Sequence, residues 1–160
     1  MEFPMPVNNY DLMELTRRLH EANLKFSELE DPSNDFGSGV LLNRREVHTI
    51  VAVGKTPDVN VTSLAEQLKI SISAASQIIL KLSKMNFVEK YRGPDNNKEV
   101  LLRLTPRGKI VYHRHEEHRA KIDEQLLQIF GPITKEEFDH VKKFIDAIDR
   151  TAELFLEKKK

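Results

Sequence analysis

Residues 60–105 carry the pattern that most narrows the folds open to this chain. An amphipathic segment over 63–68 ends at a tight turn, and a second helical segment follows over 72–84. Two short strand-like runs come next, over 87–92 and 99–104, and a polar loop separates them. This order predicts two helices joined by a short turn and followed by a β-hairpin.

A helix-turn-helix followed by a hairpin is the winged helix-turn-helix arrangement, whose second helix can enter the major groove of DNA. We therefore expect a protein that binds and switches rather than one that catalyses a reaction. The predicted fold class is mainly α with a small two- or three-stranded β wing. The predicted domains are an N-terminal helix and loop over 1–42, a DNA-binding domain over 43–105 and C-terminal helices over 106–160.

Four further helices are predicted from apolar periodicity and capping signals. They cover residues 10–29, the stretch from Asn43 to about Val53, residues 106–130, and a last helix that opens at Thr134 with a capping box. Residues 54–60 contain a proline and predict a turn.

The first and the last helix carry long apolar stripes with alternating spacings of three and four residues. The stripe positions are Leu12, Leu15, Leu19, Ala22, Phe26 and Leu29 in the first helix, and Phe138, Val141, Ile145, Ile148, Ala152 and Phe155 in the last. A winged core does not need stripes of this length, so we expect the terminal helices to form a two-fold homodimer. The alternative is a monomer whose end helices form a local bundle.

Charge is balanced over the whole chain but not along it. There are 25 basic and 25 acidic residues. Between residues 79 and 109, however, eight Lys and Arg minus three Asp and Glu leave a net charge of +5. A local basic region on a neutral protein is compatible with binding to double-stranded DNA.

Composition removes several classes of function. The chain has no cysteine, which excludes disulfides, thiolate zinc sites and cysteine redox sensing. No signal peptide and no membrane-length apolar run is visible, so a cytoplasmic location without membrane contact is expected. No phosphate-binding loop, nucleophile elbow or metalloprotease motif occurs, so neither catalytic residues nor a cofactor is predicted and the chain is not expected to be an enzyme.

The second helix of the pair supplies the candidate DNA contacts. Its outward positions are Ser73, Ala74, Ser76, Gln77, Lys81 and Lys84, and Ser71 caps its start. Gln77 can make a bidentate contact to adenine, whereas Lys81 and Lys84 suit phosphates. Ile72 and Leu80 are predicted to be partly exposed. The alternative for each position is an ordinary solvated helix surface.

The wing loop supplies a second group of candidates. Asn96 and Asn97 suit a tight turn, and Arg92 and Lys98 flank it, where they can reach the minor groove or its phosphates. The alternative is a hairpin with solvated charges.

Two histidines of the long helix, His115 and His118, fall on its apolar stripe. Two histidines one turn apart can contribute to a zinc or pH-sensing site, but they do not complete a tetrahedral site, so no metal is predicted.

Three segments together resemble the MarR family of transcriptional regulators. They are Leu64-Ala65-Glu66-Gln67-Leu68-Lys69-Ile70-Ser71, Leu82-Ser83-Lys84-Met85-Asn86-Phe87-Val88-Glu89-Lys90 and Leu104-Thr105-Pro106-Arg107-Gly108. The resemblance implies a homodimer held by its terminal helices, palindromic DNA sites, and repression that a small-molecule effector relieves. The implied effector pocket lies between the dimer helices and the DNA-binding lobe, and its expected wall residues are Leu19, Phe26, Val47 and His115.

The chain departs from the family pattern at the DNA-binding positions. Asn96 and Lys98 stand where the family wing often has Asp and Arg, and Ile72 and Gln77 stand where the recognition helix often has Arg. These losses of positive charge imply a modest DNA affinity or an unusual operator. The zero net charge of the chain and the apolar Ile72 and Leu80 on the presumed DNA face leave a second hypothesis open, a winged-helix protein-interaction module that does not bind DNA.

Overall fold

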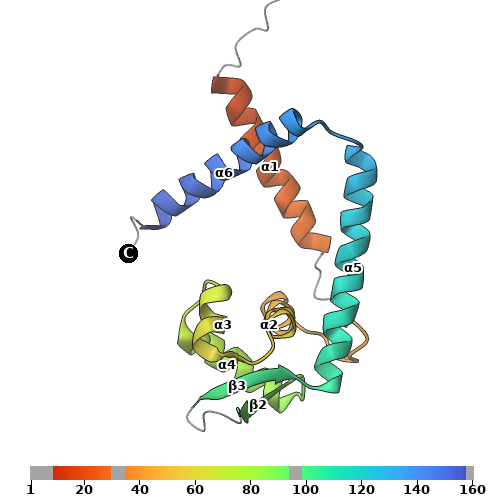
Figure 1. Cartoon of the computed structure of the whole chain (residues 1–160), viewed down its shortest axis with the longest axis vertical. Coiled ribbons are helices and arrows are strands. Elements are labelled where there is room, and N and C mark those ends of the chain that lie inside the picture. Colours follow the sequence, from red (N-terminus) through yellow and green to blue (C-terminus); the bar gives the residue numbers. More distant parts are fainter. Residues whose placement is uncertain (1–8, 30–34, 94–98, 158–160) are drawn as a thin grey trace, which may run out of the picture. The chain divides into compact units, whose positions relative to one another are not determined.

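The computed structural model of the protein describes residues 9–29, 35–93 and 99–157. These ranges contain the following elements (Figure 1): α1 (Asn9–Leu29), α2 (Arg44–Lys55), β1 (Val59–Asn60), α3 (Val61–Gln67), α4 (Ile72–Lys84), β2 (Val88–Arg92), β3 (Val100–Leu104), α5 (Pro106–Phe130) and α6 (Lys135–Glu157). The chain is divided into two compact units, and the boundary between them falls within α5, after Glu117. The predicted mainly α fold with a small β wing is confirmed.

Side chains at the helix starts explain several of these boundaries. The Asn43 side chain accepts a hydrogen bond from the Glu46 amide at 3.0 Å, and the Glu46 carboxylate accepts one from the Asn43 amide at 2.9 Å. This capping box satisfies two amides that have no partner within the helix. In the same way, Ser71 Oγ accepts from the Ala74 amide at 3.1 Å and starts α4.

The segment before α3 differs from the prediction. A turn was expected over 54–60, but Val59 and Asn60 form β1, and α3 begins at Val61 instead of Ser63. Asn60 Oδ1 accepts a hydrogen bond from the Ser63 amide at 2.8 Å, so Asn60 is the cap of α3. The two-residue β1 exists because it pairs with β3, which lies about forty residues later in the chain.

The three strands form one antiparallel sheet in the order β1-β3-β2. Strand β3 is central, with Leu102 opposite Val59 on one side and Lys90 on the other. Figure 1 shows α2, α3 and α4 gathered beside this sheet. Strands β2 and β3 lead directly into the wing loop and back, so the sheet holds both ends of the wing.

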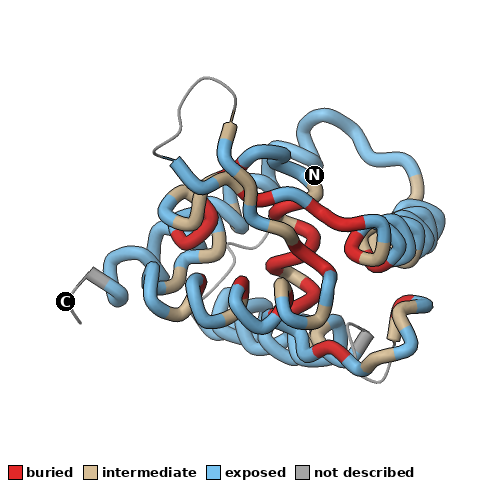
Figure 2. Tube along the Cα trace, turned by 90° about the horizontal axis from the view of Figure 1, so that it is seen from below, coloured by how far each residue is buried: buried red, intermediate tan, exposed pale blue. Residues whose placement is uncertain are grey.

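The core lies where α2, α3, α4, α5 and the sheet meet. Figure 2 shows the buried residues gathered in one region, while long helical stretches elsewhere are exposed. The core cluster consists of Phe36, Leu42, Val47, Ile50, Val51, Val53, Val59, Leu64, Ile79, Leu82, Phe87, Val88, Leu102, Leu104 and Val111.

A compact corner fixes the start of α5 against the end of α4. Thr105 Oγ1 donates to the Asn86 carbonyl at 2.6 Å and accepts from the Gly108 amide at 3.1 Å. The Arg107 guanidinium donates to the Met85 carbonyl at 2.9 Å and to the Ser38 carbonyl at 2.8 Å, and it lies 4.5 Å from the centroid of the Phe87 ring. The corner therefore joins two helices and the loop before α2 through main-chain carbonyls.

The second unit contains the end of α5 and all of α6. The Glu137 carboxylate accepts hydrogen bonds from the amide and hydroxyl of Thr134, at 2.7 and 2.9 Å, which confirms the predicted capping box. The backbone hydrogen bond from Thr134 and then its hydroxyl lower the pKa of Glu137.

Within the described ranges, no helix is long and apolar enough to cross a membrane.

Candidate nucleic-acid interface

The outer face of α4 presents the predicted base-contacting side chains together. Ser73, Ser76 and Gln77 are exposed, at spacings that place them on one stripe of the helix. The opposite face packs into the core through Ala75, Ile79 and Leu82, which are fully buried. The core contacts hold α4 so that its polar stripe faces away from the domain.

The other predicted positions of α4 differ in exposure. Ser71 is exposed and acts as the N-cap, and Ala74 is half-buried. Ile72 is 53% exposed and Leu80 is 51% exposed, as predicted for these two apolar residues. The first half of α4 contains no charged side chain. The contacts available to it are hydrogen bonds to base edges and apolar contacts to thymine methyl groups.

Lys81 has a structural partner that the sequence pattern did not reveal. Its Nζ lies 2.5 Å from Glu46 Oε1, and the Glu46 side chain is almost completely buried at the start of α2. The other oxygen of the same carboxylate caps α2. Lys81 thus neutralises a buried carboxylate and joins α4 to α2, whereas Lys84 is exposed at the end of α4.

Replacing Lys81 with methionine should lower the free energy of unfolding by about 2 kcal/mol, because a buried carboxylate then loses its counter-charge. The loss is smaller than for a fully buried pair because the Lys81 side chain is 58% exposed. Urea denaturation followed by circular dichroism measures the change. Lys84→Met is the matched control and should leave the midpoint nearly unchanged; equal midpoints for both variants would show that the ion pair has no structural role.

The wing is described up to the base of its loop. Arg92 is exposed at the end of β2, opposite Val100 of β3. The other wing candidates, Asn96, Asn97 and Lys98, lie outside the described residues, so their contacts stay predictions.

Several cations of the basic region contact groups within the protein. Arg103 Nε lies 2.9 Å from Glu89 Oε1, and the guanidinium stands 4.6 Å from the centroid of the Tyr91 ring. Arg107 donates to two main-chain carbonyls, as described above. Together with the Lys81 pair, these contacts leave fewer positive groups for phosphates than the count of charges along the sequence indicates.

Tyr91 links the sheet to the turn before β1. Its hydroxyl donates a hydrogen bond to Asp58 Oδ1. This bond to a carboxylate raises the pKa of Tyr91, because the protonated phenol is the form that donates. No local pattern predicts this contact, since Asp58 and Tyr91 are distant along the chain.

The four predicted effector-wall residues occupy different environments. Leu19 is half-buried and Phe26 is exposed, and both belong to α1. Val47 is buried in the core cluster of the winged domain. His115 is half-buried, with ring centroids 5.7 Å from Phe36 and 6.5 Å from His48. The effector wall stays a prediction.

In the part of the chain that the structure describes, no group of three or more His, Asp or Glu side chains is placed to hold a metal ion. His48, which no motif in the sequence singled out, lies near His115, with ring centroids 6.5 Å apart.

The chain is similar to known transcription regulators over its central part. A family model described as MarR family matches residues 42–100. The uncharacterized HTH-type transcriptional regulator YhjH of Bacillus subtilis is 34% identical over 110 residues, which make up 69% of this chain and 63% of that protein. The HTH-type transcriptional regulator PchR of the same organism is 29% identical over 111 residues, or 69% of this chain and 66% of that protein. The chain thus spans less than two thirds of the length of either relative.

Solved structures share the fold over most of the chain. Streptococcus pneumoniae FabT, in complex with DNA, has a TM-score of 0.70 at 19% identity and covers 92% of this chain and 99% of its own. Lactococcus lactis ZitR, a zinc-responsive MarR family member, has a TM-score of 0.66 at 22% identity and covers 88% of this chain and 98% of its own. At these identities the likeness is one of fold.

Proposed function

We propose that this chain, whose winged-helix domain matches the MarR family model, regulates transcription by binding double-stranded DNA as a homodimer. The observation that carries the proposal is the exposed stripe of Ser73, Ser76 and Gln77 on a helix whose other face is anchored in the core. A rigidly held helix with exposed hydrogen-bonding groups has the form needed for reading base edges in the major groove. The MarR match over 42–100 supports the same assignment.

The homodimer is supported by apolar side chains exposed on the terminal helices. On α6, Phe138, Val141, Ile145 and Phe155 are exposed, and on α1 the exposed stripe residues are Leu12, Leu15 and Phe26. Contiguous apolar stripes on helices favour burial against another copy of the chain. A two-fold dimer would present two copies of α4 to half-sites about one turn of DNA, roughly 34 Å, apart.

We propose repression as the mode of action and a small-molecule effector as its signal, both on the strength of the family resemblance. An effector would release DNA by binding one spacing of the two α4 helices better than the other. The proposed effector wall comprises Leu19, Phe26, Val47 and His115.

Selection from a random duplex library at two salt concentrations tests the function. Enrichment of a palindrome, with affinity that falls as salt rises, is the expected result for a dimeric DNA-binding regulator. Absence of enrichment at both salt concentrations would contradict it and favour a protein-interaction module. The observation that favours this second function is the exposure of two apolar side chains on α4, Ile72 and Leu80.

Gln77→Ala should weaken binding to the selected duplex about tenfold, because a bidentate contact to adenine contributes roughly 1–3 kcal/mol. Fluorescence anisotropy with the labelled duplex measures the dissociation constant. Gln125→Ala is the matched control, since Gln125 is an exposed glutamine on α5 outside the winged domain. Equal affinities of the two variants would show that Gln77 does not contact the bases.

A further inference from the structure

Glu46 stands in the first turn of α2, with its carboxylate buried between that helix and α4. Its side chain is 4% exposed, whereas the Lys81 side chain that meets it is 58% exposed. Glu46 Oε1 lies 2.5 Å from Lys81 Nζ, and Glu46 Oε2 accepts the Asn43 amide at 2.9 Å. Each oxygen of the carboxylate therefore has its own partner, one at the start of α2 and one on α4.

Lys81 lies on the same side of α4 as a proposed base-contacting residue. It follows Gln77 by four positions, or about one helical turn, and both side chains are exposed. Helix α4 contains no acidic residue, and its two cations, Lys81 and Lys84, both fall in its last turn. For a duplex that Gln77 reads in the major groove, these two lysines are therefore the positive groups that α4 offers to the phosphates.

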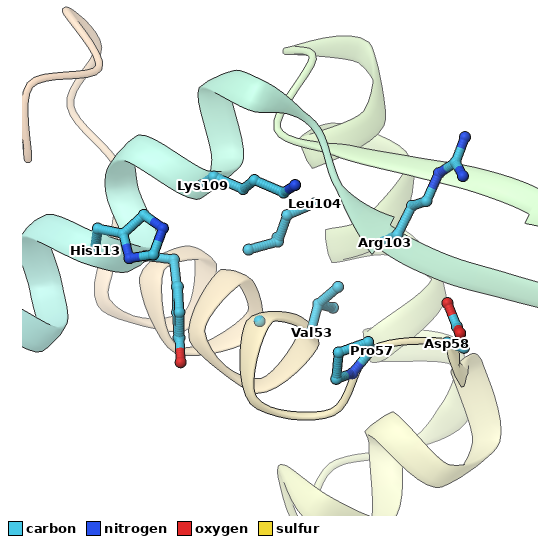
Figure 3. Close-up of a pocket in the computed structure, with 9 residues that line it drawn as sticks. Val53, Pro57, Asp58, Arg103, Leu104, Lys109 and His113 are labelled. Carbon is cyan, nitrogen blue, oxygen red and sulfur yellow. The ribbon is translucent and has the colours of Figure 1, made fainter.

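The pair of Glu46 with Lys81 differs from the pair of Arg103 with Glu89. The side chains of Arg103 and Glu89 are 54% and 46% exposed, so water solvates both groups when they separate. Figure 3 shows Arg103 at the edge of a pocket of about 400 Å³, where its side chain points away from Leu104. Glu46 has no such access to water, and its separation from Lys81 would leave a buried charge without a counter-charge.

A DNA phosphate and the Glu46 carboxylate compete for the same ammonium group. A phosphate can withdraw Lys81 only by leaving the carboxylate buried and unpaired, which the low polarity around Glu46 strongly opposes. The phosphate itself offers less in return, because it lies in water and mobile ions screen it. Lys81 therefore stays with Glu46 when DNA is bound, and it releases few counterions from the duplex.

We propose that Glu46 is a positioning residue that holds Lys81 off the phosphate backbone, and thereby sets the DNA affinity and its dependence on salt. The inference rests on the proposed function, since Glu46 acts on DNA binding without contacting DNA. Of the two lysines of α4, Lys84 is then the one that contacts a phosphate. The buried carboxylate of α2 removes one phosphate contact from each protomer, and hence two from each homodimer.

Glu46→Gln tests the inference on the full chain, with the selected duplex as the probe. Glutamine is the other residue typical of this position in a capping box, so α2 keeps its cap while the negative charge is removed. The logarithm of the association constant is measured against the logarithm of the salt concentration. This slope should become steeper by about 0.9 for each protomer, or about 1.8 for the dimer, because Lys81 is released to a phosphate.

Two controls separate the release of Lys81 from a change in net charge. Glu117→Gln removes a negative charge from an exposed residue of α5 and should leave the slope unchanged. Adding Lys81→Met to Glu46→Gln should return the slope to that of the unchanged chain. A slope for Glu46→Gln within about 0.5 of the unchanged chain would overturn the inference, and so would a steeper slope that persists in the double variant.

If Glu46→Gln lowers the urea midpoint, Lys81→Met and Lys84→Met carry the same test. Lys84→Met should flatten the slope by about 1.8, whereas Lys81→Met should change it by less than about 0.5. Equal flattening in both variants would overturn the inference, because Lys81 would then already contact a phosphate. If the unchanged chain binds no duplex, the proposed function fails and the inference with it, and that result is visible before any variant is measured.

Discussion

Gly108→Ala will lower the free energy of unfolding of the winged-helix domain by about 3 kcal/mol, because overpacking against main chain cannot be relieved by a rotamer change. A Cβ atom at this position would stand 2.0 Å from the Phe87 carbonyl oxygen and 3.3 Å from Leu104 Cδ2. That carbonyl also accepts the Thr105 amide at 3.1 Å, so it cannot move without disturbing the start of α5. The clash falls on a buried corner that joins the wing to the long helix.

Urea denaturation monitored by circular dichroism at 222 nm, the wavelength of the helix signal, would show the change as a lower midpoint with an unaltered slope. Gly93→Ala is the matched control, because its Cβ would meet only the end of the Leu101 side chain, at 3.2 Å. The control should lose less than about 1 kcal/mol. A midpoint for Gly108→Ala equal to that of Gly93→Ala would mean that α5 does not approach Phe87 as closely as described.

Arg107→Ala should also cost about 3 kcal/mol, because two hydrogen bonds from a charged donor are lost and two carbonyls lose a partner. The guanidinium donates to Met85 and Ser38 at 2.9 and 2.8 Å and stands over the Phe87 ring. One side chain thus joins the end of α4, the loop before α2 and the start of α5. Its removal weakens three segments at once.

Thermal and urea unfolding of Arg107→Ala, compared with Arg92→Ala, measure this contribution. Arg92 is exposed at the base of the wing, so its removal should change stability by less than about 0.5 kcal/mol. The affinities for DNA should show the opposite order, since Arg92 is a proposed phosphate contact and Arg107 is not. A large loss of stability in Arg92→Ala alone would contradict both assignments.

Much of the fold was predictable from local patterns. Helices α4 and α5 begin and end where capping residues and apolar periodicity placed them, at Ile72–Lys84 and Pro106–Phe130. The reason is that a cap and an amphipathic stripe are properties of neighbouring residues. Strand β1 was missed because its two residues are extended through pairing with β3, and nothing within the short segment itself specifies that pairing.

The candidate interface was predictable in part. The exposed and buried faces of α4 followed from a period of 3.6 residues, so Ser73, Ser76 and Gln77 were placed on the outer face correctly. The partners of the cations were not predictable. Lys81 and Glu46 are 35 positions apart in the sequence, and only the packing of α4 on α2 brings their charges together.

The sequence by itself determined the order of helices and strands, the apolar stripes and the uncharged first half of α4, because these depend on residues within a few turns of one another. The tertiary structure decided which positive charges remain available and where a pocket opens. Arg107 and Arg103 look alike in a count of charges, yet one donates to main-chain carbonyls and the other to Glu89. The physical reason is that a charged side chain pairs with whichever group the fold brings within hydrogen-bonding distance, and that group comes from a distant part of the chain.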